Sequence, residues 1–327
     1  MTHHDVVLVG VDGSPPSLAA LDWAAAYAHV HGLGLHLVCA YSVPTFTAAA
    51  LDGGYAALDD TAIADGARAV LDEALARVAP RGLRTTSAVA TGDAAAVLVE
   101  LSREAAMVVV GTRGRGGFAE RLLGTVSSPL PAHAHCPTVV VPYRRDDRTG
   151  ASAGDEEQED GTAPHLPVRR IVVGIDGSPA AEIALERAIR EAEAWGAELT
   201  ALAAVPVTVN TSYLAWLPSA VDHEAVLRDV GEGLDVVVDR ALAGRDLHVR
   251  RHVLDGTAAQ LLTEFSTAVD LVVVGSRGRG GFAGLLLGST SQAVLHHAVC
   301  PVMVVTTRCR DEEREGQEPA EGGPPAE

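Results

Sequence analysis

The chain contains two near copies of one stretch, Gly111-Thr-Arg-Gly-Arg-Gly-Gly-Phe-Ala119 and Gly275-Ser-Arg-Gly-Arg-Gly-Gly-Phe-Ala283, 164 positions apart in 327 residues. Each follows a β-type run rich in valine, and each ends five residues later in a Gly-[Ser/Thr] pair, so both read Gly-x2-Gly-x9-Gly-[Ser/Thr]. A glycine-rich turn leaving a buried strand lets backbone N–H groups approach a ligand, and a following helix adds the positive end of its dipole. This combination is typical of a phosphate site, and the chain carries it twice.

The offset of 164 positions holds far beyond the glycine loops. Asp12-Gly-Ser-Pro15 recurs as Asp176-Gly-Ser-Pro179. The same offset relates three further residues near the end of each copy: His133, Cys136 and Pro137 recur as His297, Cys300 and Pro301. Matches at one offset over more than a hundred residues predict a duplicated domain rather than a short solenoid repeat.

The polar composition between and after the copies suggests the domain boundaries. We expect nucleotide-binding domains at residues 1–143 and 168–307. We expect a disordered acidic linker at 144–167 and a disordered acidic tail at 308–327, because both are nearly free of large apolar residues.

Within each copy, short apolar runs alternate with helical patterns. The first copy has expected strands at 6–11, 35–40, 85–90, 107–110 and 138–141, and expected helices at 17–30, 59–78, 94–105 and 128–134. The second copy has expected strands at 171–175, 199–204, 248–253, 271–274 and 302–305. This alternation predicts an α/β fold made of two tandem, doubly wound parallel sheets covered on both faces.

Composition excludes several classes of protein. The formal net charge is −18 and the chain has no lysine, which argues against nucleic-acid and anionic-membrane partners. No apolar run approaches the roughly 18 residues that a membrane span needs. The four cysteines show no clustered spacing, and the start of the chain runs directly into a strand, so we expect a reduced, cytoplasmic protein without a signal peptide.

Ligands of open parallel sheets bind beyond the carboxyl ends of strands, where strand order reverses. Asp12 and Asp176 close the first strand of each copy, and the glycine loops follow the fourth. The arginines of the loops give local positive charge, and the residues after the last glycine offer hydroxyl and N–H groups. Asp12 alone has two readings, a cap of the next helix or a contact to a ribose or base.

Other nucleotide motifs and metal sites fit less well. A P-loop requires a Gly-Lys pair, and a dinucleotide fingerprint follows the first strand rather than the fourth. His133, Cys136 and their counterparts His297 and Cys300 have a packing or capping role in our interpretation, not a metal-binding one. No repeated Ser/His/Asp order indicates a nucleophile.

The loops, the Val-Gly-[Val/Ile]-Asp-Gly-Ser openings at 9–14 and 173–178, and the His-Ala-x-Cys-Pro endings at 133–137 and 297–301 resemble the universal stress protein family. The likeness is to its ATP-binding subclass in tandem two-domain form. It covers about residues 5–143 and 168–307.

The resemblance implies five-stranded sheets in the order 3-2-1-4-5, paired inside the chain through their fifth strands as a pseudo-dimer, with a homodimer also open. It implies that adenosine contacts Asp12 and a backbone group of Ala40, and in the second copy Asp176 and Ala204. It implies ATP as ligand, with Mg²⁺ on the phosphates and no protein side chain as metal ligand. The ATP-binding candidates are therefore Asp12, Ala40, Gly111, Arg113, Gly114, Arg115, Gly124, Thr125, Val126, Ser127, Asp176, Ala204, Gly275, Arg277, Gly278, Arg279, Gly288, Ser289, Thr290 and Ser291.

The resemblance predicts an ATP-binding stress-response or regulatory protein in which nucleotide occupancy sets conformation or association. No catalytic residue is indicated. The alternatives are a slow ATPase or adenylating enzyme of related fold, a flavin or dinucleotide carrier, and a module that has lost its nucleotide. Pro129 and Pro131 stand where the second copy has Ala293 and Leu295. They predict a displaced helix start and weaker ATP binding in the first copy.

Overall fold

The computed structural model of the chain describes residues 5–42, 60–114, 123–143, 166–206, 223–278 and 287–309. The linker and tail predicted at 144–167 and 308–327 lie almost entirely outside this part. Among the described residues of those segments, Cys309 is buried and the Arg308 guanidinium donates a hydrogen bond to the His133 carbonyl oxygen. The folded body therefore includes Cys309, past the boundary expected at residue 307.

Each half alternates strands and helices, as the sequence predicts. The first half contains β1 (Val6–Gly10), α1 (Pro15–His31), β2 (Gly34–Tyr41), α2 (Asp60–Val78), β3 (Thr85–Thr91), α3 (Ala94–Leu101), β4 (Met107–Gly111), α4 (Leu130–His133) and β5 (Thr138–Val141), with 3-10 turns at Ala79–Arg81 and Ser102–Glu104. The second half contains β6 (Arg170–Gly174), α5 (Pro179–Trp195), β7 (Glu198–Val205), α7 (His223–Ala241), β8 (Val249–Asp255), α8 (Ala258–Phe265), β9 (Leu271–Gly275), α9 (Ser289–His297) and β10 (Val302–Val305).

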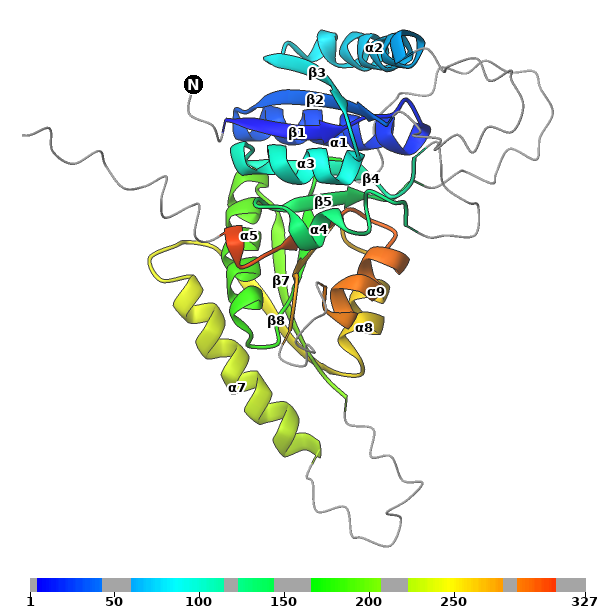
Figure 1. Cartoon of the computed structure of the whole chain (residues 1–327). Coiled ribbons are helices and arrows are strands. Elements are labelled where there is room, and N and C mark those ends of the chain that lie inside the picture. Colours follow the sequence, from blue (N-terminus) through cyan, green and yellow to red (C-terminus); the bar gives the residue numbers. More distant parts are fainter. Residues whose placement is uncertain are drawn as a thin grey trace, which may run out of the picture.

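The strands form one ten-stranded sheet in the order β3-β2-β1-β4-β5-β10-β9-β6-β7-β8 (Figure 1). Each half has the order 3-2-1-4-5 that the resemblance implied, and all pairs within a half are parallel. The halves join where β5 and β10 pair antiparallel, with Val139 opposite Met303. The implied pseudo-dimer is therefore confirmed as a single sheet.

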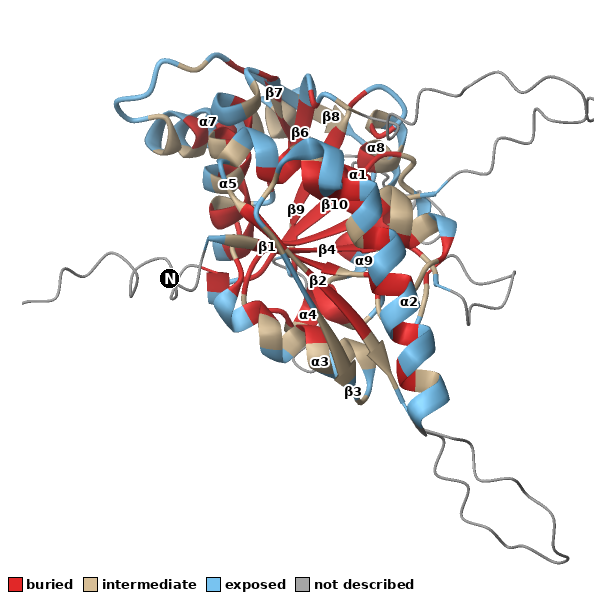
Figure 2. Ribbon diagram, turned by 90° about the horizontal axis from the view of Figure 1, so that it is seen from above, coloured by how far each residue is buried: buried red, intermediate tan, exposed pale blue. Residues whose placement is uncertain are grey.

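Helices cover both faces of this sheet (Figure 1). Residues of α1, α2, α5 and α7 pack in one apolar cluster, and residues of α3, α4, α8 and α9 pack in the other. The central strands β1, β4, β9 and β10 are buried on both sides (Figure 2), which explains their unbroken valine-rich runs. Among the described helices, none combines the length and the apolar composition that a membrane span requires.

Local signals fix the ends of α1 and α5. Ser14 and Ser178 are N-caps whose hydroxyl oxygens accept hydrogen bonds from the backbone N–H of Ser17 and Ala181, and proline follows each cap. Both helices end at glycines with left-handed φ, 67° at Gly32 and 62° at Gly196. The duplicated Gly-Ser-Pro segments thus start equivalent helices in both halves.

The helix expected at 128–134 differs from its prediction. It spans only Leu130–His133, whereas its counterpart α9 runs over Ser289–His297. Pro129 and Pro131 have no N–H to donate, so the residues before Leu130 form turns instead of helix. The predicted displacement of the helix start is confirmed.

The junction of the halves gives a test of the sheet. Replacing Met303, which is fully buried, by glutamate is expected to lower the free energy of unfolding by more than about 3 kcal/mol, because it buries an unpaired charge. Val236 on α7 is 56% exposed, and glutamate there should change stability by less than about 0.5 kcal/mol. Urea unfolding followed by circular dichroism measures both, and similar losses would contradict the position of β10.

Candidate functional site

Each half has a cavity at the carboxyl ends of its first and fourth strands, where the strand order reverses. The cavity volume is about 250 Å³ in the first half and about 420 Å³ in the second. The first is lined by Asp12, Ala40, Gly111, Arg113, Gly114, Gly124, Thr125, Val126 and Ser127 among the predicted residues. The second is lined by Asp176, Gly275, Arg277, Gly278, Gly288, Ser289, Thr290 and Ser291. The structure thus brings together nearly all the candidate residues that it describes.

Three predicted residues do not fall into this set. Ala204 lies near the end of β7 and does not line the second cavity, although its counterpart Ala40 lines the first. Arg115 and Arg279 lie outside the described residues.

Asp12 and Asp176 are held by the turns that start α1 and α5. The backbone N–H and the hydroxyl of Ser14 donate to Asp12 Oδ1 at 3.0 and 2.6 Å. In the second half the Ser178 N–H donates to Asp176 Oδ1 at 2.9 Å. Since Ser14 and Ser178 cap the helices, the reading of Asp12 as a helix cap is wrong. Both carboxylates line the cavities instead.

The glycines at the strand ends serve close packing. A Cβ at Gly111 would lie 2.5 Å from the Pro16 carbonyl oxygen, and one at Gly275 would lie 2.8 Å from the Ala180 carbonyl carbon. No side chain fits between the end of the strand and the start of the helix. These glycines therefore set the shape of the cavity floor rather than only permitting a turn.

Gly114 and Gly278 leave room for the carboxylates. A Cβ on either one would collide with Oδ2 of Asp12 or Asp176. The second glycine of each motif and the aspartate of the first strand are thus fitted to each other, although about a hundred residues separate them.

The last glycine and the serine three residues later fasten the loop. The Gly124 N–H donates to the Thr112 carbonyl oxygen at 2.7 Å and to Ser127 Oγ at 2.9 Å, and the Ser127 hydroxyl donates to the same carbonyl at 2.7 Å. In the second half Ser291 Oγ lies 3.1 Å from the Ser276 carbonyl oxygen. The sequence suggested that these hydroxyls face a ligand, but both serines are buried and their hydroxyls bond to the loop.

The two cavities differ where the helix begins. Gly288 is the N-cap of α9 and has no side chain to satisfy the first N–H groups. The first helical hydrogen bond of this turn runs from Gln292 N–H to the Gly288 carbonyl oxygen, so the N–H groups of Ser289, Thr290 and Ser291 lack partners within the helix. In the first half the equivalent residues precede α4 and lie in turns. The first-half turn keeps the equivalent hydrogen bond, from the Ser128 N–H to the Gly124 carbonyl oxygen at 3.2 Å, but only the second-half turn continues directly into a regular helix.

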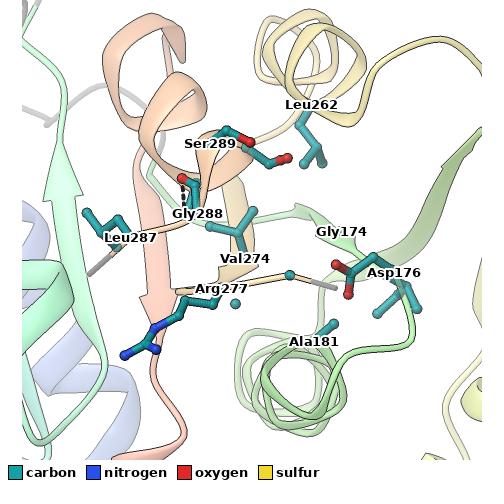
Figure 3. Close-up of a pocket in the computed structure, with 14 residues that line it drawn as sticks. Gly174, Asp176, Ala181, Leu262, Val274, Arg277, Leu287, Gly288 and Ser289 are labelled. Atoms are coloured by element: carbon teal, nitrogen blue, oxygen red, sulfur yellow. Dashed lines mark hydrogen bonds between the residues drawn. The ribbon is translucent and has the colours of Figure 1, made fainter. Parts of the chain in front are cut away.

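Arg113 and Arg277, the arginines of the glycine motifs that the structure describes, bring positive charge to the cavities. Arg113 is half-buried and Arg277 is exposed. Figure 3 shows the Arg277 guanidinium directed away from Asp176, while Leu262 points into the cavity from α8 and Ala181 borders it on α5. The arginine is therefore placed at the cavity edge.

Sequence reasoning missed the apolar wall of each cavity. Leu98 on α3 and Leu262 on α8 line the two sites, and they face Gly10 and Gly174 at the strand ends. A Cβ at Gly10 would lie 2.9 Å from a Leu98 methyl carbon. Both pairs keep the offset of 164 positions, and that shared offset was the signal that could have identified them.

Of the residues in the His/Cys endings, the two cysteines are buried, whereas His133 is half-buried and His297 is exposed. Cys136 and Cys300 are buried in the cluster on the α3/α4/α8/α9 face, and none of the four cysteines, all of which the structure describes, forms a disulfide. Burial raises the pKa of the Cys300 thiol to about 12, which keeps it protonated at neutral pH. The described part of the chain contains no group of three or more His, Cys, Asp or Glu side chains that could hold a metal ion.

Comparisons with known proteins agree with the duplicated architecture. The model of the universal stress protein family matches residues 3–142 and 167–306. A universal stress protein of Mycobacterium tuberculosis and one of Mycobacterium bovis are each 35% identical over 321 residues, covering 91% of this chain and 94% of the relative. The crystal structure of a universal stress protein from Archaeoglobus fulgidus covers 92% of this chain and 98% of its own, with a TM-score of 0.63 and 20% identity. The last likeness shows the fold alone.

The packing role of Gly111 gives a test of the cavity floor. Gly111→Ala is expected to lower the free energy of unfolding by about 1–3 kcal/mol, because its methyl group overlaps the start of α1. Gly66 lies on α2 with open space around its Cα, and alanine there should stabilise by up to about 1 kcal/mol. Urea denaturation of both variants gives the comparison, and a neutral Gly111→Ala would refute the assigned packing.

Proposed function

Because the chain belongs to the universal stress protein family, in its tandem two-domain form, we propose that it binds an adenine nucleotide in each cavity and that occupancy sets its conformation or association. The observation that carries the proposal is the repeated crevice at the point of strand reversal, with glycine backbone on its floor and a carboxylate at one side.

The second cavity has features that favour the binding of a phosphate chain. The N–H groups of Ser289, Thr290 and Ser291 and the dipole of α9 favour negative charge at this edge. Arg277 adds positive charge to a protein whose net charge is −18. ATP is the proposed ligand, with Mg²⁺ held by its phosphate oxygens and by water rather than by a cluster of protein side chains.

The other end of each cavity suits a nucleoside. Asp12 and Asp176 keep one oxygen beside a glycine Cα, and the proposal assigns them to the ribose. Leu98 and Leu262 give an apolar wall for a base. The backbone at Ala40 and Ala204 would complete the adenosine contacts.

A regulatory role fits the site better than rapid catalysis. Each cavity contains an aspartate that accepts a hydrogen bond from a serine, and an arginine lies at its edge. The described residues suggest no general base. The second candidate, a slow ATPase or adenylating enzyme, rests on the same phosphate contacts. Turnover above about 1 s⁻¹ with any acceptor would favour the adenylating enzyme. We also assign the protein to the reducing cytoplasm, where its four buried thiols would persist, and leave a homodimer as one form of the regulated association.

Mg-ATP is expected to stabilise the folded protein. At a free concentration near 100 times Kd, one coupled site adds about 2.7 kcal/mol to the free energy of unfolding, a rise of a few degrees in the melting temperature. Differential scanning calorimetry with ATP, ADP, AMP and no nucleotide measures the rise. An unchanged melting temperature with all three nucleotides would end the proposal.

The two sites are expected to differ in affinity. Gly278→Val should weaken ATP binding more than Gly114→Val, since each valine displaces the neighbouring aspartate but only the second site has the α9 N-terminus to lose. The two variants are matched controls for each other in isothermal titration. A larger loss in Gly114→Val would show that the first site is the stronger one.

A further inference from the structure

Helices α1 and α5 meet on the symmetry axis that relates the two halves. Val139 and Met303 face each other in the sheet, and Tyr27 bonds to Glu191 between the helices. The residues of each pair are 164 positions apart, the offset of the duplication. Equivalent positions that touch each other lie on the axis, so the axis passes through both contacts.

Six residues around this point form what we call the axial cluster. They are Trp23, Tyr27 and His31 on α1, and Arg187, Glu191 and Trp195 on α5. Glu191 is 0% exposed and Tyr27 is 1% exposed, so their polar atoms depend on protein partners.

Glu191 has partners from both halves. The Tyr27 hydroxyl donates to Oε1 at 2.8 Å and the Arg187 Nε–H donates to the same oxygen at 2.7 Å, while His31 Nε2 lies 3.1 Å from Oε2. An Arg187 Nη2–H also donates to the Tyr27 oxygen at 2.6 Å. Burial disfavours the charged carboxylate, but Arg187, His31 and Tyr27 hold the pKa of Glu191 below its usual value.

The equivalent positions carry unlike residues, and the contacts depend on that difference. Trp23 corresponds to Arg187, Tyr27 to Glu191, and His31 to Trp195. The contact of His31 with Glu191 is polar, and its symmetry mate, Trp195 with Tyr27, is aromatic, with ring centroids 6.5 Å apart. Pairing of unlike halves therefore gives the Glu191 carboxylate polar partners from the other half and brings the Tyr27 and Trp195 rings together, although the indole N–H groups of Trp23 and Trp195 are buried without hydrogen-bond partners.

Pairing of like halves would lose these matches. If two second halves paired, Glu191 would face its own copy, and Trp195 would take the place of His31 beside each carboxylate. Each carboxylate would then lose the hydrogen bonds of the Tyr27 hydroxyl and of His31. Two first halves would set Tyr27 against its own copy with no carboxylate to accept its hydrogen bond, and would bury a second Trp23 where Arg187 now lies.

We propose that the α1–α5 face is a recognition surface that accepts only the complementary half of this chain and rejects a second copy of either half. The same chemistry rejects a single domain of this fold that lacks the complementary polar and aromatic residues at these positions. The surface favours the pairing of β5 with β10 over the pairing of either strand with its own copy. This inference is independent of the proposed nucleotide.

The full-length chain allows the like pairings to be built. The first triple variant gives α1 the three axial residues of α5, through Trp23→Arg, Tyr27→Glu and His31→Trp. The second triple variant gives α5 the three axial residues of α1, through Arg187→Trp, Glu191→Tyr and Trp195→His. All six changes together exchange the axial residues of the two helices, so that unlike residues again face each other. This sixfold variant is the matched control. Each triple variant is expected to melt more than about 5 °C below the unmodified chain, and the sixfold variant to recover at least about half of either loss.

Two results would overturn the inference: triple variants as stable as the unmodified chain, or a sixfold variant whose loss equals the sum of the triple losses. If all three variants fail to fold, the pair Tyr27→Phe and Glu191→Gln decides by a double-mutant cycle in urea. A coupling of about fivefold or more in the unfolding equilibrium constant supports a specific contact between Tyr27 and Glu191 across the axis, and additive effects refute it.

Discussion

The antiparallel pairing of β5 with β10 is the constraint on which the rest of the molecule depends. Two five-stranded parallel sheets would each leave a valine-rich edge open, and an open edge is a template for aggregation. Joining these edges makes one ten-stranded sheet and buries the central strands under helices on both faces. It also places α1 against α5, where the axial cluster meets.

Duplication gave the halves the same backbone and left their side chains free to diverge. The cavities share strand ends, glycines and the aspartate that faces them, because those features are fixed by close backbone packing. They differ at the helix start, where two prolines in the first half replace residues that donate helical hydrogen bonds in the second. The axial cluster differs more strongly between the halves. A residue on the axis contacts its own equivalent, and two residues of different chemistry, such as Tyr27 and Glu191, can form a hydrogen bond there.

Much of the fold could be predicted from the sequence. The strands at 138–141 and 302–305 have the bounds expected from their apolar runs, and the remaining strands agree to within about two residues. The helix expected at 128–134 spans only Leu130–His133, because Pro129 and Pro131 have no N–H groups to donate. The described residues of the two glycine motifs line the cavities, as their repeated spacing suggested. Leu98 and Leu262 were missed because a leucine on a helix carries no local sign of whether it faces a core or a cavity.

The sequence by itself determined the duplication, the fold class and the positions at which glycine is required, since these are set by local backbone geometry and by apolar periodicity. Only the tertiary structure decided which groups are available to a ligand and which are already bonded. The Ser127 hydroxyl holds its own loop and Asp12 faces Gly114, because residues distant in sequence approach to within a hydrogen bond or a van der Waals contact. The pairing of Tyr27 with Glu191 likewise follows from the axis, which exists only once β5 has met β10.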